Sequence, residues 1–119
     1  MHEMGIISGV LDATLATARD AGAERVTAVN LRVGEMTEAI EDALQFAFEA
    51  LSEGTVCEGA KLSIEMVPPK SLCFECANEF EHDRFHRACP ECGSYETMLL
   101  SGRELDIASI EVDIPDEEE

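Results

Sequence analysis

Residues 73–92 read CFECANEFEHDRFHRACPEC, with one pair of cysteines at each end. Two residues between paired cysteines let both sulfurs of one turn reach a single ion, and two such turns complete a tetrahedron of thiolates. Soft sulfur donors in that geometry favour Zn²⁺, and four protein ligands leave no open position for a substrate. The spacing therefore predicts a structural zinc site with Cys73, Cys76, Cys89 and Cys92 as its ligands.

The region around these cysteines, residues 70–98, differs in composition from the chain on either side. Regular apolar periodicity disappears there, and cysteines, charges and turn formers replace it. Because the region has too little apolar material for a core of its own, metal binding would supply its folding energy. A four-cysteine iron–sulfur cluster or a redox-active pair fits the pattern less well. We expect a zinc-ribbon-like module inserted into a body made of residues 1–69 and 99–119.

Apolar periodicity predicts two helices and three strands in the body. The helices are expected over residues 3–22 and from about Thr37, the expected cap, to Ser52. The expected core stripe of the second helix is Ile40, Ala43, Leu44, Ala47, Phe48 and Leu51. The strands are expected within residues 25–34, 60–67 and 103–114. These elements predict an α+β fold: a small mixed three-stranded sheet packed with two helices, plus the inserted module.

The chain is strongly acidic, with 26 Asp and Glu against 8 Lys and Arg and a formal charge of -18. Binding to a nucleic acid backbone needs clustered bases, and acids outnumber bases even within the module. No apolar run is long enough to span a bilayer, and we find no secretory signal at the start. Five cysteines without an export signal indicate thiols or metal ligands rather than disulfides. We expect a cytoplasmic protein that binds neither nucleic acid nor membrane.

Three further residues carry metal-ligand chemistry outside the cysteine pairs. His82 and His86 lie between the pairs, and we interpret them as surface residues of the loop. The alternatives are that one replaces a cysteine ligand or acts as a pH-sensitive neighbour of the zinc. Cys57 is interpreted as a small buried or half-buried residue. No catalytic triad, phosphate loop or pair of catalytic carboxylates can be assembled, so we do not expect an enzyme.

The first residues, MHE, form a second candidate metal site. The α-amine of Met1 and the amide nitrogen and imidazole of His2 can close adjacent chelate rings around one ion. Glu3 or a partner can supply a fourth donor. Nitrogen donors in a plane suit Ni²⁺ or Cu²⁺ better than Zn²⁺, which prefers a tetrahedron. The alternative is that these are polar residues without a role, as chain ends often carry.

The whole layout resembles the HypA family, the nickel chaperones of hydrogenase maturation. The matching residues are the start MHEM, the amphipathic helix after it, the run VTAVNLRVGEM at residues 26–36, and the CFEC…CPECGS module. The resemblance implies Ni²⁺ delivery to the large subunit of [NiFe]-hydrogenase together with a HypB-type GTPase, and in some organisms also service to urease. It carries the nickel ligands over to Met1, His2 and Glu3, and the zinc ligands to the four paired cysteines.

On this resemblance we expect a metallochaperone. Residues 1–69 and 99–119 would form a nickel-binding α/β domain and residues 70–98 a zinc-binding domain, in a monomer or weak homodimer. Some members place a histidine directly beside a cysteine pair, whereas His82 and His86 stand further off here. The alternative function is a zinc-ribbon adaptor that bridges proteins, with MHE incidental. The sequence leaves open which nickel enzyme is the recipient and whether the two metal sites are coupled.

Overall fold

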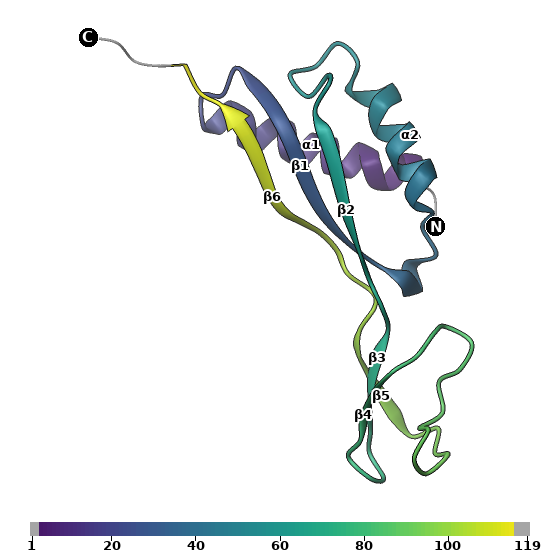
Figure 1. Ribbon diagram of the computed structural model, residues 1–119. Coiled ribbons are helices and arrows are strands. Elements are labelled where there is room, and N and C mark those ends of the chain that lie inside the picture. Colours follow the sequence, from purple (N-terminus) through teal and green to yellow (C-terminus); the bar gives the residue numbers. More distant parts are fainter. Residues whose placement is uncertain (1–2, 116–119) are drawn as a thin grey trace. The chain divides into compact units, whose positions relative to one another are not determined.

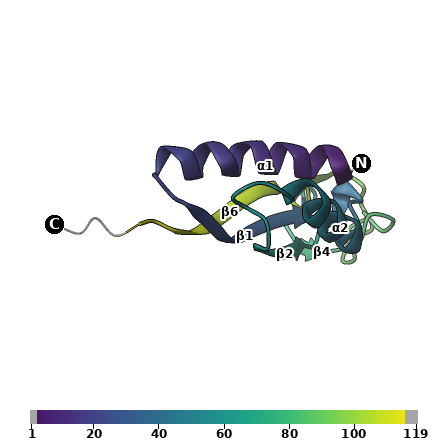
Figure 2. The ribbon, with the colours of Figure 1, turned by 90° about the horizontal axis from the view of Figure 1, so that it is seen from above.

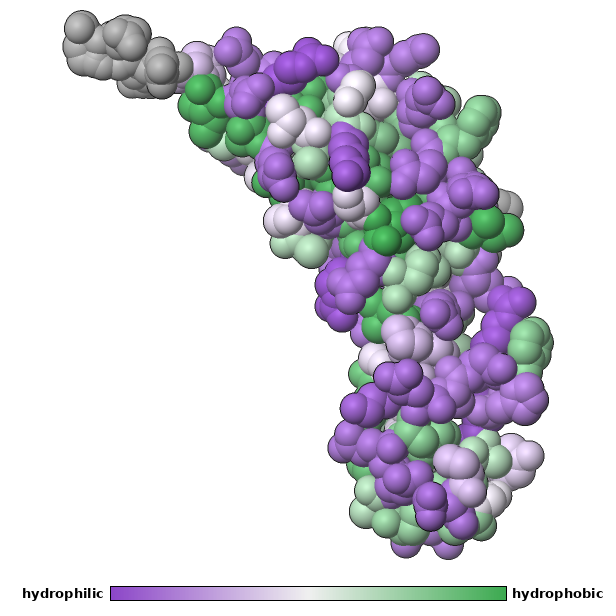
Figure 3. Space-filling model, in the orientation of Figure 1, coloured by the Kyte–Doolittle hydropathy of each residue, from purple (hydrophilic) through white to green (hydrophobic). Residues whose placement is uncertain are grey.

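The computed structural model describes residues 3–115 (Figure 1). Within them the chain divides into two compact units. Residues 3–31, 39–64 and 107–115 form what we call the body unit, and residues 32–38 and 65–106 form the cysteine unit. None of the helices in the described residues is long and apolar enough to cross a membrane. Charged and polar side chains cover much of the face drawn in Figure 3, as the acidic composition leads one to expect.

The body unit contains two helices and most of a three-stranded sheet. The helices are α1 (Glu3–Asp20) and α2 (Glu41–Ser52), and the strands are β1 (Arg25–Gly34), β2 (Lys61–Val67) and β6 (Leu105–Asp113). The strand order is β2-β1-β6, so β1 is central. In Figure 1, β1 and β2 run in the same direction and β6 runs in the opposite one. The sheet is therefore mixed, and the expected α+β class is confirmed.

The core of the body unit lies between the sheet and the helices. Figure 2 shows α1 lying along one face of the sheet. Val29 and Leu31 of β1 and Ile7 and Leu11 of α1 are all at most 4% exposed. α1 ends at Asp20, and Gly22 follows with φ 72°, a left-handed conformation that glycine adopts without strain. Apolar periodicity thus located both the helix and the face that it buries.

The second helix begins four residues later than the sequence predicted. Residues Glu35–Thr37 instead form a 3-10 turn, η1, in which the Thr37 hydroxyl donates to the Gly34 carbonyl at 2.8 Å. Glu38 follows with φ 63°, a left-handed conformation that ends the turn before α2 starts. Thr37 as the cap of α2 was therefore wrong.

The buried stripe of α2 agrees with the predicted one only in part. Its buried residues are Leu44, Ala47, Phe48 and Ser52. Ile40, expected in the core, is 63% exposed because the helix begins only after it. Leu51, also expected there, is 36% exposed. Leu44, Ala47 and Phe48 are thus buried as predicted, whereas the expected burial of Ile40 and Leu51 was wrong.

The cysteine unit holds a second sheet, of three short strands. These are β3 (Lys70–Cys73), β4 (Glu79–Glu81) and β5 (Thr97–Ser101), in the order β4-β3-β5. β3 pairs antiparallel with both neighbours, with Ser71 opposite Phe80 on one side and Leu99 on the other. The predicted residues 70–98 lie inside this unit. Their status as a separate domain with those limits stays a prediction.

A close approach of two main-chain segments also belongs to the cysteine unit. Gly34 N–H donates to the Glu104 carbonyl at 2.7 Å, and Met36 N–H donates to the Gly102 carbonyl at 2.8 Å. A Cβ atom on Gly34 would collide with the Gly102 carbonyl. Only glycine therefore fits at position 34 in this arrangement. This pairing holds residues 34–36 beside residues 102–104, just before the point where the sequence predicted the second helix to begin.

Candidate metal centre

The four predicted zinc ligands come together in the cysteine unit. Their Sγ atoms all lie within 4.8 Å of one another. The Sγ atoms of Cys73 and Cys92 are 3.6 Å apart, as are those of Cys76 and Cys89. Four thiolates at a Zn–S distance of about 2.3 Å form a tetrahedron with edges of about 3.8 Å. The sulfur positions therefore fit one tetrahedral ion.

The two cysteine turns have the same local structure. Ala77 N–H donates to the Cys73 carbonyl and Gly93 N–H to the Cys89 carbonyl, both at 2.8 Å. Ala77 and Gly93 both have left-handed φ values, 64° and 76°. The first cysteine of each turn also donates its own N–H to a residue five positions later, Asn78 or Ser94. Gly93 adopts this conformation without strain because it has no Cβ atom, whereas Ala77 adopts it with a Cβ atom in place.

Burial alternates between the members of each cysteine pair. Cys73 and Cys89 are buried at 0% and 2% exposure, whereas Cys76 and Cys92 are exposed. Cys73 and Cys89 form a small buried cluster with Phe80 of β4. A bound ion would therefore be held between a buried pair of sulfurs and a solvent-facing pair.

The protonation of these thiols is set by their shared hydrogen bonds. Burial raises the pKa of Cys89, but backbone N–H groups of Cys92 and Glu91, together with Cys76, outweigh it and lower the pKa to about 6. A backbone N–H at Asn78 lowers the pKa of Cys76, but its hydrogen bond to Cys89 and its desolvation prevail and raise it to about 12. Metal binding needs thiolates, so loading the site releases protons.

The two histidines of the module lie outside the four-sulfur group. His86 is exposed, and its Nδ1 lies 2.8 Å from a carboxylate oxygen of Asp83. His82 is half-buried. Its Nδ1 donates to the Asp83 carbonyl at 2.6 Å, and its Nε2 accepts from the Ser71 hydroxyl at 2.8 Å. The surface position expected for both is thus found for His86, whereas His82 is tied to strand β3.

Cys57 lies in the body unit and is completely buried. Burial raises the pKa of its thiol, against a smaller opposite effect of the Thr55 hydroxyl. Within the described residues, the four paired cysteines are the one group of three or more His, Cys, Asp or Glu side chains that could hold an ion.

Of the candidate nickel ligands, Met1 and His2 lie outside the described residues, and Glu3 begins α1. The Glu3 carboxylate oxygen Oε2 accepts the N–H of Ile40, the residue at the cap of α2, at 3.0 Å. Glu3 thus joins the starts of the two helices. Reasoning from sequence missed this contact, since its partner lies 37 positions further along the chain.

The fold and the four-thiol centre define a small α+β metal-binding protein whose own cysteines close the site. Residues 1–112 match the family model described as "Hydrogenase/urease nickel incorporation, metallochaperone, hypA". The chain belongs to this HypA family, as the resemblance predicted. The family consists of metallochaperones that act as hydrogenase maturation factors, so the chain is a metallochaperone and not an enzyme, as expected.

Individual relatives extend over nearly the whole chain. The protein named hydrogenase maturation factor HypA of Desulfitobacterium hafniense is 43% identical over 113 residues, covering 95% of this chain and 99% of its own. Its namesake in Methanocaldococcus jannaschii is 39% identical, covering 98% and 100%. The solution structure of the Ni metallochaperone HypA from Helicobacter pylori superposes with a TM-score of 0.69 at 24% identity, covering 97% and 100%. That structure supports the fold.

Proposed function

We propose that this chain binds Ni²⁺ at its N terminus and delivers it to the large subunit of a [NiFe]-hydrogenase during maturation. Urease is the second recipient that the family description suggests. The observation that carries the proposal is the family match from residue 1, which includes the start MHE. The relatives named hydrogenase maturation factor support the choice of recipient.

The proposed nickel donors are the α-amine of Met1 and the amide nitrogen and imidazole of His2. These three nitrogens close adjacent chelate rings, and the planar arrangement suits Ni²⁺. The fourth donor would come from Glu3 or from a partner. Nickel binding through the Glu3 carboxylate would compete with the hydrogen bond that this carboxylate accepts from Ile40. The fourth nickel donor is therefore expected from the Glu3 main chain or from a partner group. An incomplete shell at a chain end lets a partner with better donors remove the ion by ligand exchange.

We assign the four-cysteine centre to a structural Zn²⁺. The four soft donors and their spacing support this choice. When bound, zinc would join the two cysteine turns through four sulfur bonds. The chain itself supplies the matched turns and the small buried cluster of Cys73, Phe80 and Cys89, which orient the sulfurs.

The proposed partners are a HypB-type GTPase and the hydrogenase large subunit, met in the cytoplasm by a monomer or weak homodimer of this chain. Support comes from the maturation role of the family. The strong negative charge disfavours nucleic acid as a partner, because a phosphate backbone needs clustered bases.

Calorimetric nickel titration tests the proposal, with zinc counted separately. His2→Ala and a variant with a few residues added before Met1 should each weaken nickel binding by at least about tenfold, or about 1.4 kcal/mol. His86→Ala is the matched control, because His86 is an exposed histidine outside the N terminus. Zinc content should stay unchanged in all three. Unchanged nickel affinity in His2→Ala would refute the proposal.

Nickel affinity should also fall as the pH is lowered from about 8 to about 6. Protons compete with the ion for the α-amine, with an ordinary pKa of about 7.7 to 8.0, and for the imidazole, near about 6.5. Both groups must be deprotonated to bind, so each proton bound weakens the site. A pH-independent affinity over this range, measured by the same titration, would exclude these two donors.

One observation favours the adaptor function as a second candidate. Three aromatic side chains of the cysteine unit are exposed: Phe74 at 63%, Phe85 at 75% and Tyr95 at 79%. Exposed aromatic residues are enriched in protein interfaces. An adaptor without nickel transfer predicts that hydrogenase maturation survives His2→Ala and fails when these aromatic residues are replaced.

A further inference from the structure

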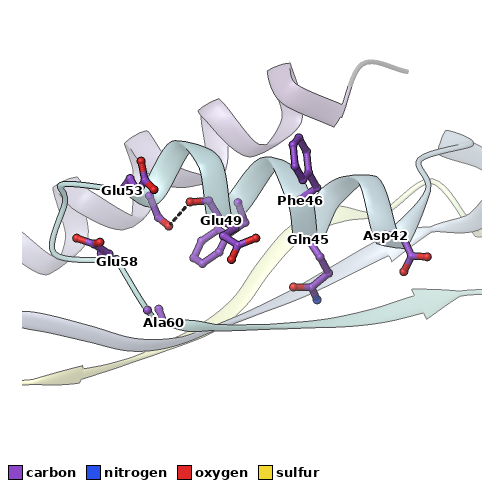
Figure 4. A pocket seen from close by; sticks show the side chains of 10 residues that line it. Asp42, Gln45, Phe46, Glu49, Glu53, Glu58 and Ala60 are labelled. Carbon is purple, nitrogen blue, oxygen red and sulfur yellow. Dashed lines mark hydrogen bonds between the residues drawn. The ribbon is translucent and has the colours of Figure 1, made fainter.

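A groove of about 760 Å³ lies beside α2 in the body unit (Figure 4). We call it the α2 groove. The helix and the turn that follows it supply its lining, chiefly Asp42, Gln45, Phe46, Glu49, Glu53 and Glu58. Figure 4 shows Gln45 and Glu49 on the side of α2 that faces β2, with Phe46 standing on the other side of the helix. The Gln45 side chain links α2 to β2, because its Nε2 donates to the Leu62 carbonyl at 2.7 Å.

Phe46 is the apolar feature of this groove. Its side chain is 70% exposed, although the same helix buries Leu44 and Phe48 almost completely. Ala43 and Ala50 stand three positions before it and four after it, which places all three on one side of the helix. Small residues beside a large ring let a second helix approach closely. Phe46 therefore contributes little to the buried core of the body unit.

The groove is also strongly acidic. Residues 33–60 contain seven Asp and Glu and no Lys, Arg or His. Four of these acids line the groove, and none of the four forms an ion pair within the part of the chain that the structure describes. The nearby Arg25 guanidinium donates to the Glu58 carbonyl at 2.8 Å and is not part of the lining. The carboxylates do not converge closely enough to form a metal site among the described residues.

We propose that the α2 groove is a docking site for a basic amphipathic helix of a protein partner. An apolar side chain of that helix would pack on Phe46, and Lys or Arg side chains would lie over Asp42, Glu49 and Glu53. Asp42 and Glu53 are about eleven helical steps apart, which is about 16 Å or three turns of a partner helix. Charge complementarity of this kind steers association and sets orientation, while a buried aromatic residue supplies contact area. The occupant is a protein, because the acidic lining repels nucleic acid and anionic lipid.

The test uses the zinc-loaded full chain and a fluorescent 14-residue helical peptide with Leu at positions 4, 7 and 11 flanked by Lys. The control peptide keeps Leu and replaces Lys with Glu. The basic peptide should shift the amide NMR signals of residues 42–60 and bind, by anisotropy, more tightly than the acidic one. Phe46→Ser should weaken binding at least about fivefold, as expected for an interface residue that matters.

Charge controls separate docking from general attraction to an acidic protein. The double variant Glu49→Gln/Glu53→Gln should weaken binding at least about fivefold. The matched double variant Asp12→Asn/Asp20→Asn removes the same charge from exposed positions of α1 and should leave binding unchanged. Equal losses in both double variants, an unaffected Phe46→Ser, or shifts spread over the whole acidic surface would each overturn the proposal.

A cellular measurement rests on the proposed function and links the groove to it. Phe46→Ser/Glu49→Lys should lower hydrogenase activity in cells while the purified variant keeps its nickel and zinc affinities. Full activity of this variant would overturn the docking proposal. Full activity of His2→Ala in the same cells would instead refute the nickel proposal, so the two failures are distinguishable.

Discussion

The body unit and the cysteine unit are stabilised by different means. The body unit buries side chains from two helices and a central strand, with Ile7, Val29 and Leu44 all at 0% exposure. The buried cluster of the cysteine unit consists of Cys73, Phe80 and Cys89, so two of its three members are metal ligands. One unit therefore has an apolar core built from helices and a strand, whereas the buried cluster of the other combines one aromatic ring with two thiols.

This difference has an energetic consequence. Burying one large apolar side chain contributes about 1.5 to 3 kcal/mol, which cannot offset the conformational entropy lost when the whole cysteine unit becomes ordered. Zn²⁺ binding to a structural site of this kind contributes an apparent free energy of about 10 to 16 kcal/mol in zinc-finger peptides. We expect a contribution of the same order in the cysteine unit. The cysteine unit is thus expected to need its ion permanently. A chain end that held nickel through few donors, as we propose, could give its ion away, and the same chain would then keep one metal and transfer another.

The largest expected effect follows from breaking the sulfur site. Cys73→Ser should abolish tight zinc binding, because it removes a buried ligand, and should collapse the amide dispersion of residues 70–98. Signals of α1 and α2 should remain. Metal analysis and NMR spectra provide the measurement. Cys57→Ser is the matched control, since it removes a buried thiol of the body unit and should keep the zinc.

A core truncation in the body unit should produce the converse result. Leu44→Ala removes a completely buried side chain and should lower the free energy of unfolding of this unit by about 2 to 5 kcal/mol. Zinc content should not change. Ile40→Ala, at a position 63% exposed, should stay within about 0.5 kcal/mol of wild type. Urea unfolding followed through the signals of α2 measures both, and equal losses would contradict the observed stripe.

A smaller effect is expected at the contact between the helix starts. Glu3→Ala removes the acceptor of the Ile40 N–H and should cost about 0.5 to 2 kcal/mol, the range found for lost helix caps. Glu3→Gln keeps an acceptor oxygen and should cost less. Hydrogen exchange of the Ile40 amide in nickel-free protein gives the readout. Equal protection in wild type and Glu3→Ala would show that this hydrogen bond contributes nothing.

The smallest effect concerns a surface ion pair of the cysteine unit. Nη1 of Arg84 lies 3.3 Å from Oε1 of Glu38, and both side chains are substantially exposed. A double-mutant cycle with Arg84→Gln and Glu38→Gln should give a coupling energy of about 0 to 1 kcal/mol that decreases with added salt. A coupling energy well above this range would mean that the Arg84–Glu38 ion pair, and not the bound zinc, orders the segment around Arg84.

Much of the fold and of the centre followed from local sequence. The spacing of Cys73, Cys76, Cys89 and Cys92 predicted that they would meet, and their sulfur distances agree. The apolar period of residues 3–20 located α1 with its buried face. Both features depend on contacts between residues close in the chain, which the sequence displays directly. The nickel ligands and the domain limits stay predictions.

The start of α2 depended instead on contacts that are distant in sequence. Thr37 has the chemistry of a helix cap, but Gly34 and Met36 pair with residues 102–104, and Thr37 ends a 3-10 turn before α2. α2 consequently begins at Glu41, and the contact of Glu3 with Ile40 connects it to α1. The sequence by itself predicted the group of four thiols and the helices and strands of the body unit, because side-chain type and period are local properties; it did not predict β3, β4 and β5. Only the tertiary structure decided where α2 begins and that Phe46 faces solvent, because main-chain pairing between distant segments outweighs a local capping preference.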